Sequence, residues 1–162
     1  MKTKQKGFSL IEVLVVLGII GLFTSFLTPR ISNYLALGKE TKAIATLNSL
    51  RTASEMYNLE TGNSLGKDKL DKNLSKEDVE KLKDYISNGY KDLLKNLDEN
   101  NEILYEIGGS KSDLETEVIY GGNIKFTFKA PEGENSDGIK IWILPDENVG
   151  DYNMKGIKWV DL

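Results

Sequence analysis

The residue with the clearest chemical potential is Glu12, a carboxylate inside an almost uninterrupted apolar run. The run from Phe8 to Thr28 is 21 residues long. As an α-helix it would measure ~31 Å, about the thickness of the hydrocarbon core of a bilayer. Glu12 is the only charged residue in the run. Because an ionisable side chain is costly inside a membrane, such a residue is a functional candidate by default.

The chain contains no cysteine and no histidine. Disulfides, thiolate or imidazole zinc sites, and Ser-His-Asp or Cys-His catalysis are therefore excluded, and a metal would have to be a hard cation bound by oxygen. No pair of carboxylates and no hydroxyl–base arrangement stands out, so we expect a protein that is not an enzyme and has no cofactor. The formal charge is −4, and an acidic chain is a poor partner for nucleic acid.

A short basic head that ends in Gly7 precedes the apolar run. Ordinary secretory signals share this layout, but their small-residue cleavage site follows the apolar run. Residues 26–30, Phe-Leu-Thr-Pro-Arg, contain no such site. One alternative is therefore an uncleaved signal anchor that carries an extracytoplasmic binding domain or enzyme. Basic residues flank both ends of the run, so their distribution does not settle its orientation.

A more specific pattern is the string Lys-Gly-Phe-Ser-Leu-Ile-Glu-Val-Leu at residues 6–14. It resembles the prepilin signal of type IV pilins and type II secretion pseudopilins. The resemblance implies that a membrane peptidase cuts between Gly7 and Phe8 and that Phe8 becomes N-methylated. It also implies that Glu12 takes the place of the family's near-invariant glutamate in assembly. Gly21 and Pro29 match the family's glycine and proline, between which the helix can loosen in a filament.

Each of these residues also has a plainer interpretation. Ser9 and Glu12 match a capping box, in which the glutamate accepts a hydrogen bond from a backbone N–H at the helix start. Gly18 and Gly21 are typical of packing positions in membrane helices. Pro29 is compatible with a kink where the helix leaves the membrane.

The rest of the chain predicts an α+β fold. From residue 31 to residue 59 the pattern is helical, and Gly62 is a plausible stop. The apolar stripe of this helix consists of Ala43, Leu47, Leu50, Ser54 and Tyr57, and we expect Glu40 and other charged residues largely off the stripe. After Gly109 the period becomes two, which predicts strands at residues 117–120, 123–129 and 139–144 and a last edge strand at 157–160. We expect a long helix packed on a small antiparallel β-meander, with a hairpin turn at Gly121-Gly122.

The loop after the third predicted strand is acidic. Some pseudopilins hold calcium in a C-terminal loop, so the resemblance makes this loop a weak calcium candidate, although the family's aspartate-proline-tryptophan-glycine signature is absent. The candidate ligands are Asp146, Glu147, Asn148 and Asp151.

The predicted domains are a leader (1–7), a transmembrane and assembly helix (8–29), its amphipathic continuation (30–60), a variable, partly helical region (61–113) and a sheet region (114–162). By resemblance, we expect a structural subunit of a type IV pilus-like filament or of a type II secretion or DNA-uptake filament. Its expected partners are other pilin or pseudopilin subunits, the prepilin peptidase, an inner-membrane assembly platform and membrane lipid. The precursor would span the membrane once with its globular part extracytoplasmic, and the mature subunit would lie in a periplasmic or cell-surface filament.

Overall fold

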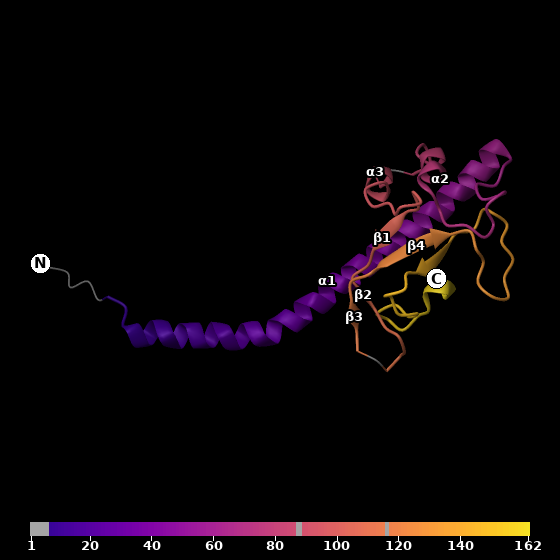
Figure 1. The fold of residues 1–162 in the computed structure, drawn as a ribbon. Helices are drawn as coiled ribbons and strands as arrows, with labels where there is room; N and C mark the ends of the chain where they lie inside the picture. The colour runs from indigo at the N-terminus through magenta and orange to yellow at the C-terminus, as the bar shows by residue number, and fades with distance from the viewer. Residues whose placement is uncertain (1–6, 87–88, 116) are drawn as a thin grey trace, which may run out of the picture. The chain divides into compact units, whose positions relative to one another are not determined.

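The computed structural model describes residues 7–86, 89–115 and 117–162. The chain divides into two compact units, one ending at Leu35 and the other running from Ala36 to Leu162. Helix α1, Leu10–Thr61, begins in the first unit and ends in the second (Figure 1). Each unit is described by itself below.

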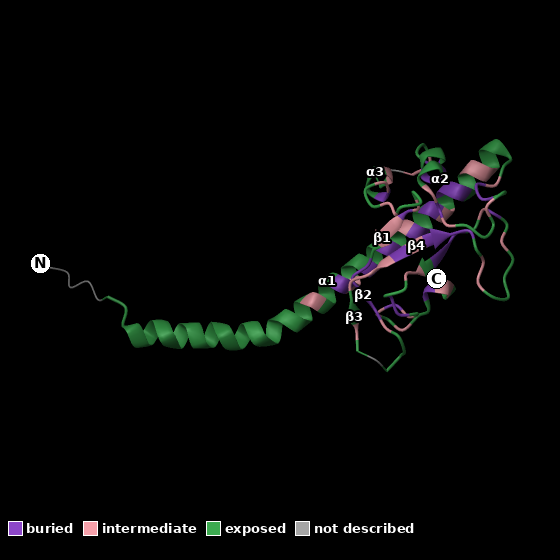
Figure 2. Ribbon diagram, viewed as in Figure 1, coloured by how far each residue is buried: buried purple, intermediate pink, exposed green. Residues whose placement is uncertain are grey.

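In the first unit the side chains of α1 are almost all exposed (Figure 2). By length and composition alone, this part of the helix could cross a membrane. Its hydroxyls bond within the helix, because Thr24 Oγ1 donates to the Ile20 carbonyl and Thr28 Oγ1 to the Thr24 carbonyl, both at 2.8 Å. Such internal bonds satisfy polar side chains where water is absent. Pro29 lies inside the helix, where it removes one backbone hydrogen bond.

In the second unit one face of α1 is buried. The buried residues follow the predicted stripe and extend it toward the N-terminus: Ala36, Glu40, Ala43, Leu47, Leu50, Ala53 and Ser54. Tyr57 is half-buried. The helix ends as predicted, since Gly62 has φ +68° and its N–H donates to the Asn58 carbonyl at 2.8 Å.

A three-stranded antiparallel sheet packs against this face. Its strands are β1 (Leu104–Glu106), β4 (Asn123–Thr127) and β5 (Trp142–Pro145), in the order β1-β4-β5. A separate antiparallel pair consists of β2 (Gly109–Ser110) and β3 (Ile119–Tyr120). The core includes the buried apolar side chains of α1 between Ala43 and Ala53, together with Ile124, Phe126, Phe128, Ile141 and Ile143. The predicted α+β class, with a long helix on a small antiparallel sheet, is confirmed.

The order of the strands differs from the predicted meander. Strand β3 does not form a hairpin with β4 across Gly121-Gly122, because it pairs with β2 instead. Strand β4 pairs with β5 and with β1, which lies in the region predicted to be variable. Residues 157–160 do not form an edge strand, since Trp159–Asp161 is a 3-10 helix. These pairings join residues far apart in the chain, so local alternation could not reveal them.

Strands β4 and β5 are also shorter than predicted, because the loop between them uses polar side chains to satisfy its backbone. Ser136 Oγ donates to the Phe128 carbonyl at 2.6 Å, and Asp137 Oδ1 accepts from the N–H groups of Ile139 and Lys140, both at 2.8 Å. These bonds replace the ladder that would have extended the strands.

Two short helices, α2 (Lys76–Lys81) and α3 (Tyr90–Leu93), lie in the region predicted to be variable, and their Val79 and Leu93 belong to the core. The N-cap of helix α2 is Ser75. The buried Asp78 accepts from the Ser75 N–H at 3.0 Å and pairs with Lys69 at 3.1 Å.

Candidate assembly site in the N-terminal helix

The predicted cleavage and assembly residues lie at the start of α1. Gly7 and Phe8 precede the helix, and Phe8 is 88 % exposed. Residues 1–6 of the predicted leader lie outside the described residues. An exposed backbone on both sides of the Gly7–Phe8 bond is what a peptidase needs to reach it.

Glu12 caps the helix. Its Oε2 accepts a hydrogen bond from the Ser9 N–H at 2.8 Å, and the Ser9 hydroxyl accepts from the Ile11 N–H at 3.4 Å. This is the capping geometry that the sequence pattern allows. The capping hydrogen bond uses Oε2 of Glu12, and within the described residues Oε1 accepts no hydrogen bond. A capping role and a contact with a second chain can therefore coexist.

Gly21 and Pro29 lie further along the same helix. At Gly18 and Gly21 a methyl group would meet no atom within 4 Å in this single chain, so these glycines leave open surface at which another helix could approach closely. Pro29 lies eight positions after Gly21, and its ring removes one hydrogen bond from the helix ladder.

The acidic loop is bonded as a turn. Asp146 Oδ1 accepts from the Glu147 N–H at 3.1 Å, and the Asp151 carbonyl accepts from the Trp159 N–H at 3.0 Å. No group of three or more Asp or Glu side chains in the described part of the chain could hold a metal ion. The geometry thus lends no support to calcium at Asp146, Glu147, Asn148 and Asp151, and calcium does not enter the function proposed below.

Glu40 is the polar residue that sequence reasoning misplaced. We expected it off the apolar stripe, but it is fully buried. Its position, four residues after Ala36 and three before Ala43, puts it on the buried face. This spacing could have predicted that Glu40 is buried, but its charge led us to expect it to be exposed.

Comparisons with known proteins agree with the motif. Residues 2–28 match the family model described as the prokaryotic N-terminal methylation motif. The type IV major fimbrial protein of Dichelobacter nodosus is 38 % identical over 55 residues, which are 34 % of this chain and 35 % of that protein. The fimbrial protein of Pseudomonas aeruginosa is 39 % identical over 56 residues, or 35 % of this chain and 36 % of that protein.

A third relative is the prepilin peptidase-dependent protein D of Escherichia coli K12, 42 % identical over 59 residues, or 36 % of this chain and 40 % of that protein. The chain thus spans only about a third of the length of the curated relatives first found. No solved structure matches it.

The apolar helix and its N-terminal motif define the class, a protein with a prepilin-type N-terminal segment. Over this N-terminal part the chain is similar to type IV fimbrial proteins and to a prepilin peptidase-dependent protein, in agreement with the resemblance that the motif predicted.

Proposed function

We propose that this chain is a structural subunit of a type IV pilus-like, type II secretion or DNA-uptake filament. It is cut between Gly7 and Phe8, N-methylated at Phe8, and assembled through the first half of α1. The proposal assigns it no catalytic role. The precursor spans the membrane once, with the globular unit extracytoplasmic, and its partners are like subunits, a prepilin peptidase and an assembly platform.

The observation that carries the proposal is the exposed apolar first half of α1, which has a single carboxylate near its start. Such a surface needs lipid or other helices around it. Cleavage after Gly7 would leave a cationic amino group on Phe8, and methylation would keep that charge. Glu12 lies ~6 Å further along the helix.

Glu12 and the new amino terminus can then join neighbouring subunits. In apolar surroundings an unpaired carboxylate is costly by roughly 2.5–3.5 kcal/mol on insertion scales. The amino terminus of an adjacent chain would neutralise it, and the free Oε1 offers an acceptor for that contact. Since only one stagger of two helices brings these groups together, the pair also sets the axial register.

The test is Glu12→Gln. Glutamine keeps the capping box but removes the charge, so we expect normal processing and membrane levels with filament incorporation abolished. Incorporation is measured as the subunit content of sheared filaments. Thr24→Val, which removes a polar group bonded within its own helix, serves as the control and should assemble normally. Normal incorporation of Glu12→Gln would mean that Glu12 only caps the helix and has no role in assembly.

The alternative, an uncleaved anchor, makes a different prediction. In that case the intact mass of the membrane-extracted protein would retain residues 2–7 in the wild-type chain.

A further inference from the structure

One cation and one aromatic residue lie just beyond the apolar run of α1. Arg30 is the only charged residue between Glu12 and Lys39. Tyr34 is the only tyrosine or tryptophan before Tyr57. Both side chains belong to the first unit and are exposed, Tyr34 to 74 %. Neither makes a hydrogen bond, ion pair or ring contact with any described residue, so both can bind a partner outside the chain.

Both side chains lean toward the end of the apolar run. Tyr34 follows Arg30 by four positions, which makes the two neighbours on one surface of the helix. Side chains in an α-helix tilt toward its N-terminus, and the apolar run ends on that side, at Thr28. If the run spans a bilayer, this is the level at which hydrocarbon gives way to headgroups.

The chemistry of the two side chains matches the headgroup layer. The arginine guanidinium is a planar cation that binds phosphate through two parallel N–H groups. Tyrosine is enriched at membrane–water interfaces, because its ring is apolar and its hydroxyl is polar. Arg30 and Tyr34 thus present a phosphate-binding cation and an interfacial ring about one helical turn apart.

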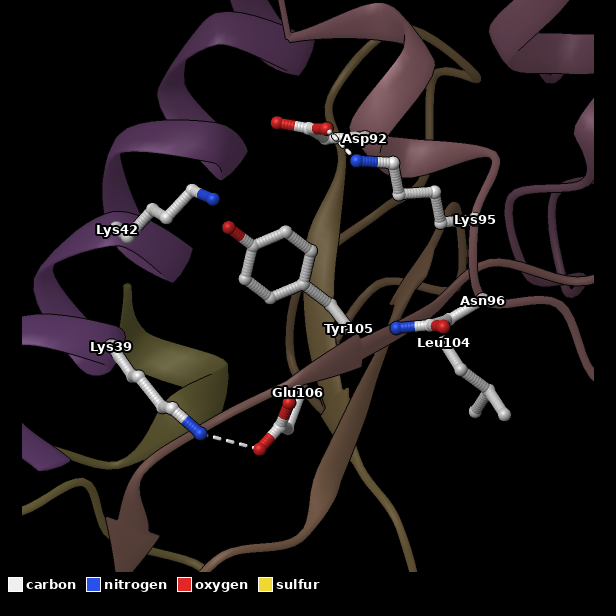
Figure 3. Close-up of a pocket in the computed structure, with 8 residues that line it drawn as sticks. All are labelled: Lys39, Lys42, Asp92, Lys95, Asn96, Leu104, Tyr105 and Glu106. Carbon is white, nitrogen blue, oxygen red and sulfur yellow. Dashed lines mark hydrogen bonds and ion pairs between the residues drawn. The ribbon is translucent and has the colours of Figure 1, made fainter.

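The lysines that follow in α1 are not equivalent to Arg30. Lys39 and Lys42 belong to the globular unit and line a pocket of about 330 Å³ together with Asp92 and Glu106 (Figure 3). Lys39 forms an ion pair with Glu106. Acidic side chains therefore share the pocket with these lysines, whereas Arg30 pairs with no described acid.

A lipid phosphate suits Arg30 better than the α1 helix of a neighbouring copy does. Glu12 is the only carboxylate in the exposed first half of α1, and the proposed function pairs it with an amino terminus. A phosphodiester carries the charge opposite to that of Arg30, and it lies where the apolar run ends. Charge and position both favour the membrane.

We propose that Arg30 and Tyr34 form a headgroup anchor, in which the Arg30 guanidinium binds the phosphodiester of a membrane phospholipid and the Tyr34 ring lies at the interface. The inference rests on the proposed function, which places the apolar run across a membrane. A helix from Phe8 to Arg30 would measure ~33 Å, close to the thickness of a hydrocarbon core. With Arg30 held at one face, the Gly7–Phe8 bond lies at the other face, where a peptidase can reach it.

The contact can be measured in the wild-type chain, because the chain has only two arginines. The full chain, labelled with ¹³C at the arginine Cζ, is reconstituted into vesicles of phosphatidylcholine and phosphatidylglycerol. Solid-state NMR records which arginine signal is dephased by lipid ³¹P. We expect strong dephasing for Arg30 and none for Arg51, whose guanidinium donates to carbonyls inside the globular unit. Arg30→Lys assigns the two signals by removing one of them.

Flotation of the same vesicles separates the two ways to fail. If the chain floats with the vesicles and ³¹P leaves the Arg30 signal unchanged, the anchor is overturned and the filament function stands. The same result is expected if Arg30 binds a neighbouring copy instead. If the chain does not float with the vesicles, the membrane span on which the proposed function depends is contradicted.

A second measurement follows the depth of the helix. The chain has no cysteine, so Leu27→Cys provides a single site for a spin label, whose depth is obtained from its exposure to oxygen and to a water-soluble nickel complex. Arg30→Leu with Tyr34→Leu extends the uncharged part of the helix to Lys39, so the label should move toward the bilayer centre by one helical turn, ~5 Å.

The matched control is Arg30→Lys with Tyr34→Trp, which keeps a cation and an interfacial ring and should leave the depth of the label unchanged. Equal depths in the wild type and the leucine variant would overturn the anchor.

Discussion

Glu40 Oε2 accepts a hydrogen bond from the Met154 backbone N–H at 2.8 Å, which joins α1 to a segment 114 positions later. Arg51 also joins α1 to distant segments by hydrogen bonds. Its Nε donates to the Ile141 carbonyl at 2.7 Å, and its Nη2 donates to the Leu162 carbonyl at 2.8 Å. The second half of α1 is therefore an internal part of the globular unit.

We accordingly predict that a fragment beginning at Ile31 folds as a soluble monomer. In that fragment Leu47→Asp should lower the free energy of unfolding by about 3 kcal/mol or more, because it places an unpaired charge in the core. Urea unfolding measures the difference. Leu59→Asp, on the same helix at a residue that is 85 % exposed, should change stability little. Equal unfolding curves for the two variants would mean that the helix does not dock as described.

Glu40 itself should make stability depend on pH. Burial raises the pKa of Glu40 above 4.5, against smaller lowering effects of the Met154 N–H and Lys155. The folded state then binds more protons than the unfolded state between pH 4.5 and the raised pKa, so stability falls as pH rises through that window. Glu40→Gln should remove this fall and be more stable than the wild type at pH 7, with little difference at pH 4. A variant less stable than the wild type at both pH values would contradict this.

Asp98 should act with the opposite sign. Burial would raise its pKa, but the Lys125 ammonium at 2.6 Å and the N–H groups of Glu102 and Asn100 outweigh that effect, and the pKa lies below 3.8. The stabilisation that ionised Asp98 contributes is complete above pH 3.8. It is lost as the pH falls through the lower pKa that Asp98 has in the folded state. Asp98→Asn should therefore reduce stability at pH 7 and weaken the acid dependence below pH 4. Glu99→Gln, at an exposed neighbour, is the control; if it matched Asp98→Asn, the Lys125 pair would not be the cause.

Gly108 allows the chain to pass close to α1. A Cβ at this position would lie 2.1 Å from the Ala36 Cα, which is far inside van der Waals contact. Gly108→Ala should destabilise the globular unit by about 1–3 kcal/mol or more, because the backbone at position 108 or at Ala36 would have to move to relieve the clash. Gly38→Ala, exposed on the same helix with open space around it, should be neutral or stabilising by up to ~1 kcal/mol. Thermal unfolding of both variants distinguishes them.

Processing should depend on Gly7. A side chain at this position would obstruct the backbone's approach to a peptidase cleft, so Gly7→Val should accumulate only the uncut form. Intact mass spectrometry of the membrane-extracted protein measures this. Ser9→Thr, two residues beyond the proposed cut and conservative at the cap, should be processed normally. Full cleavage of Gly7→Val would place the cut elsewhere.

The sequence by itself determined the features that depend on near neighbours along the chain. The order of Gly7, Phe8 and Glu12 before an apolar run indicated the prepilin-type segment. The three-and-four spacing from Ala43 to Tyr57 predicted the buried face of α1, and the alternation of Ile124, Phe126 and Phe128 predicted a strand. Helix and strand periods are local, so they can be read without a partner.

Only the tertiary structure decided which strands pair and which charges are buried. Strand β1 is three residues long and β2 two, too short to carry an alternating pattern, and their hydrogen-bond partners lie elsewhere in the chain. Glu40 is buried because folding brings the Met154 N–H to it. Lys39 is paired because folding brings Glu106 to it, although the two residues are 67 positions apart. In each case the deciding interaction joins distant residues, which spacing along the chain does not record.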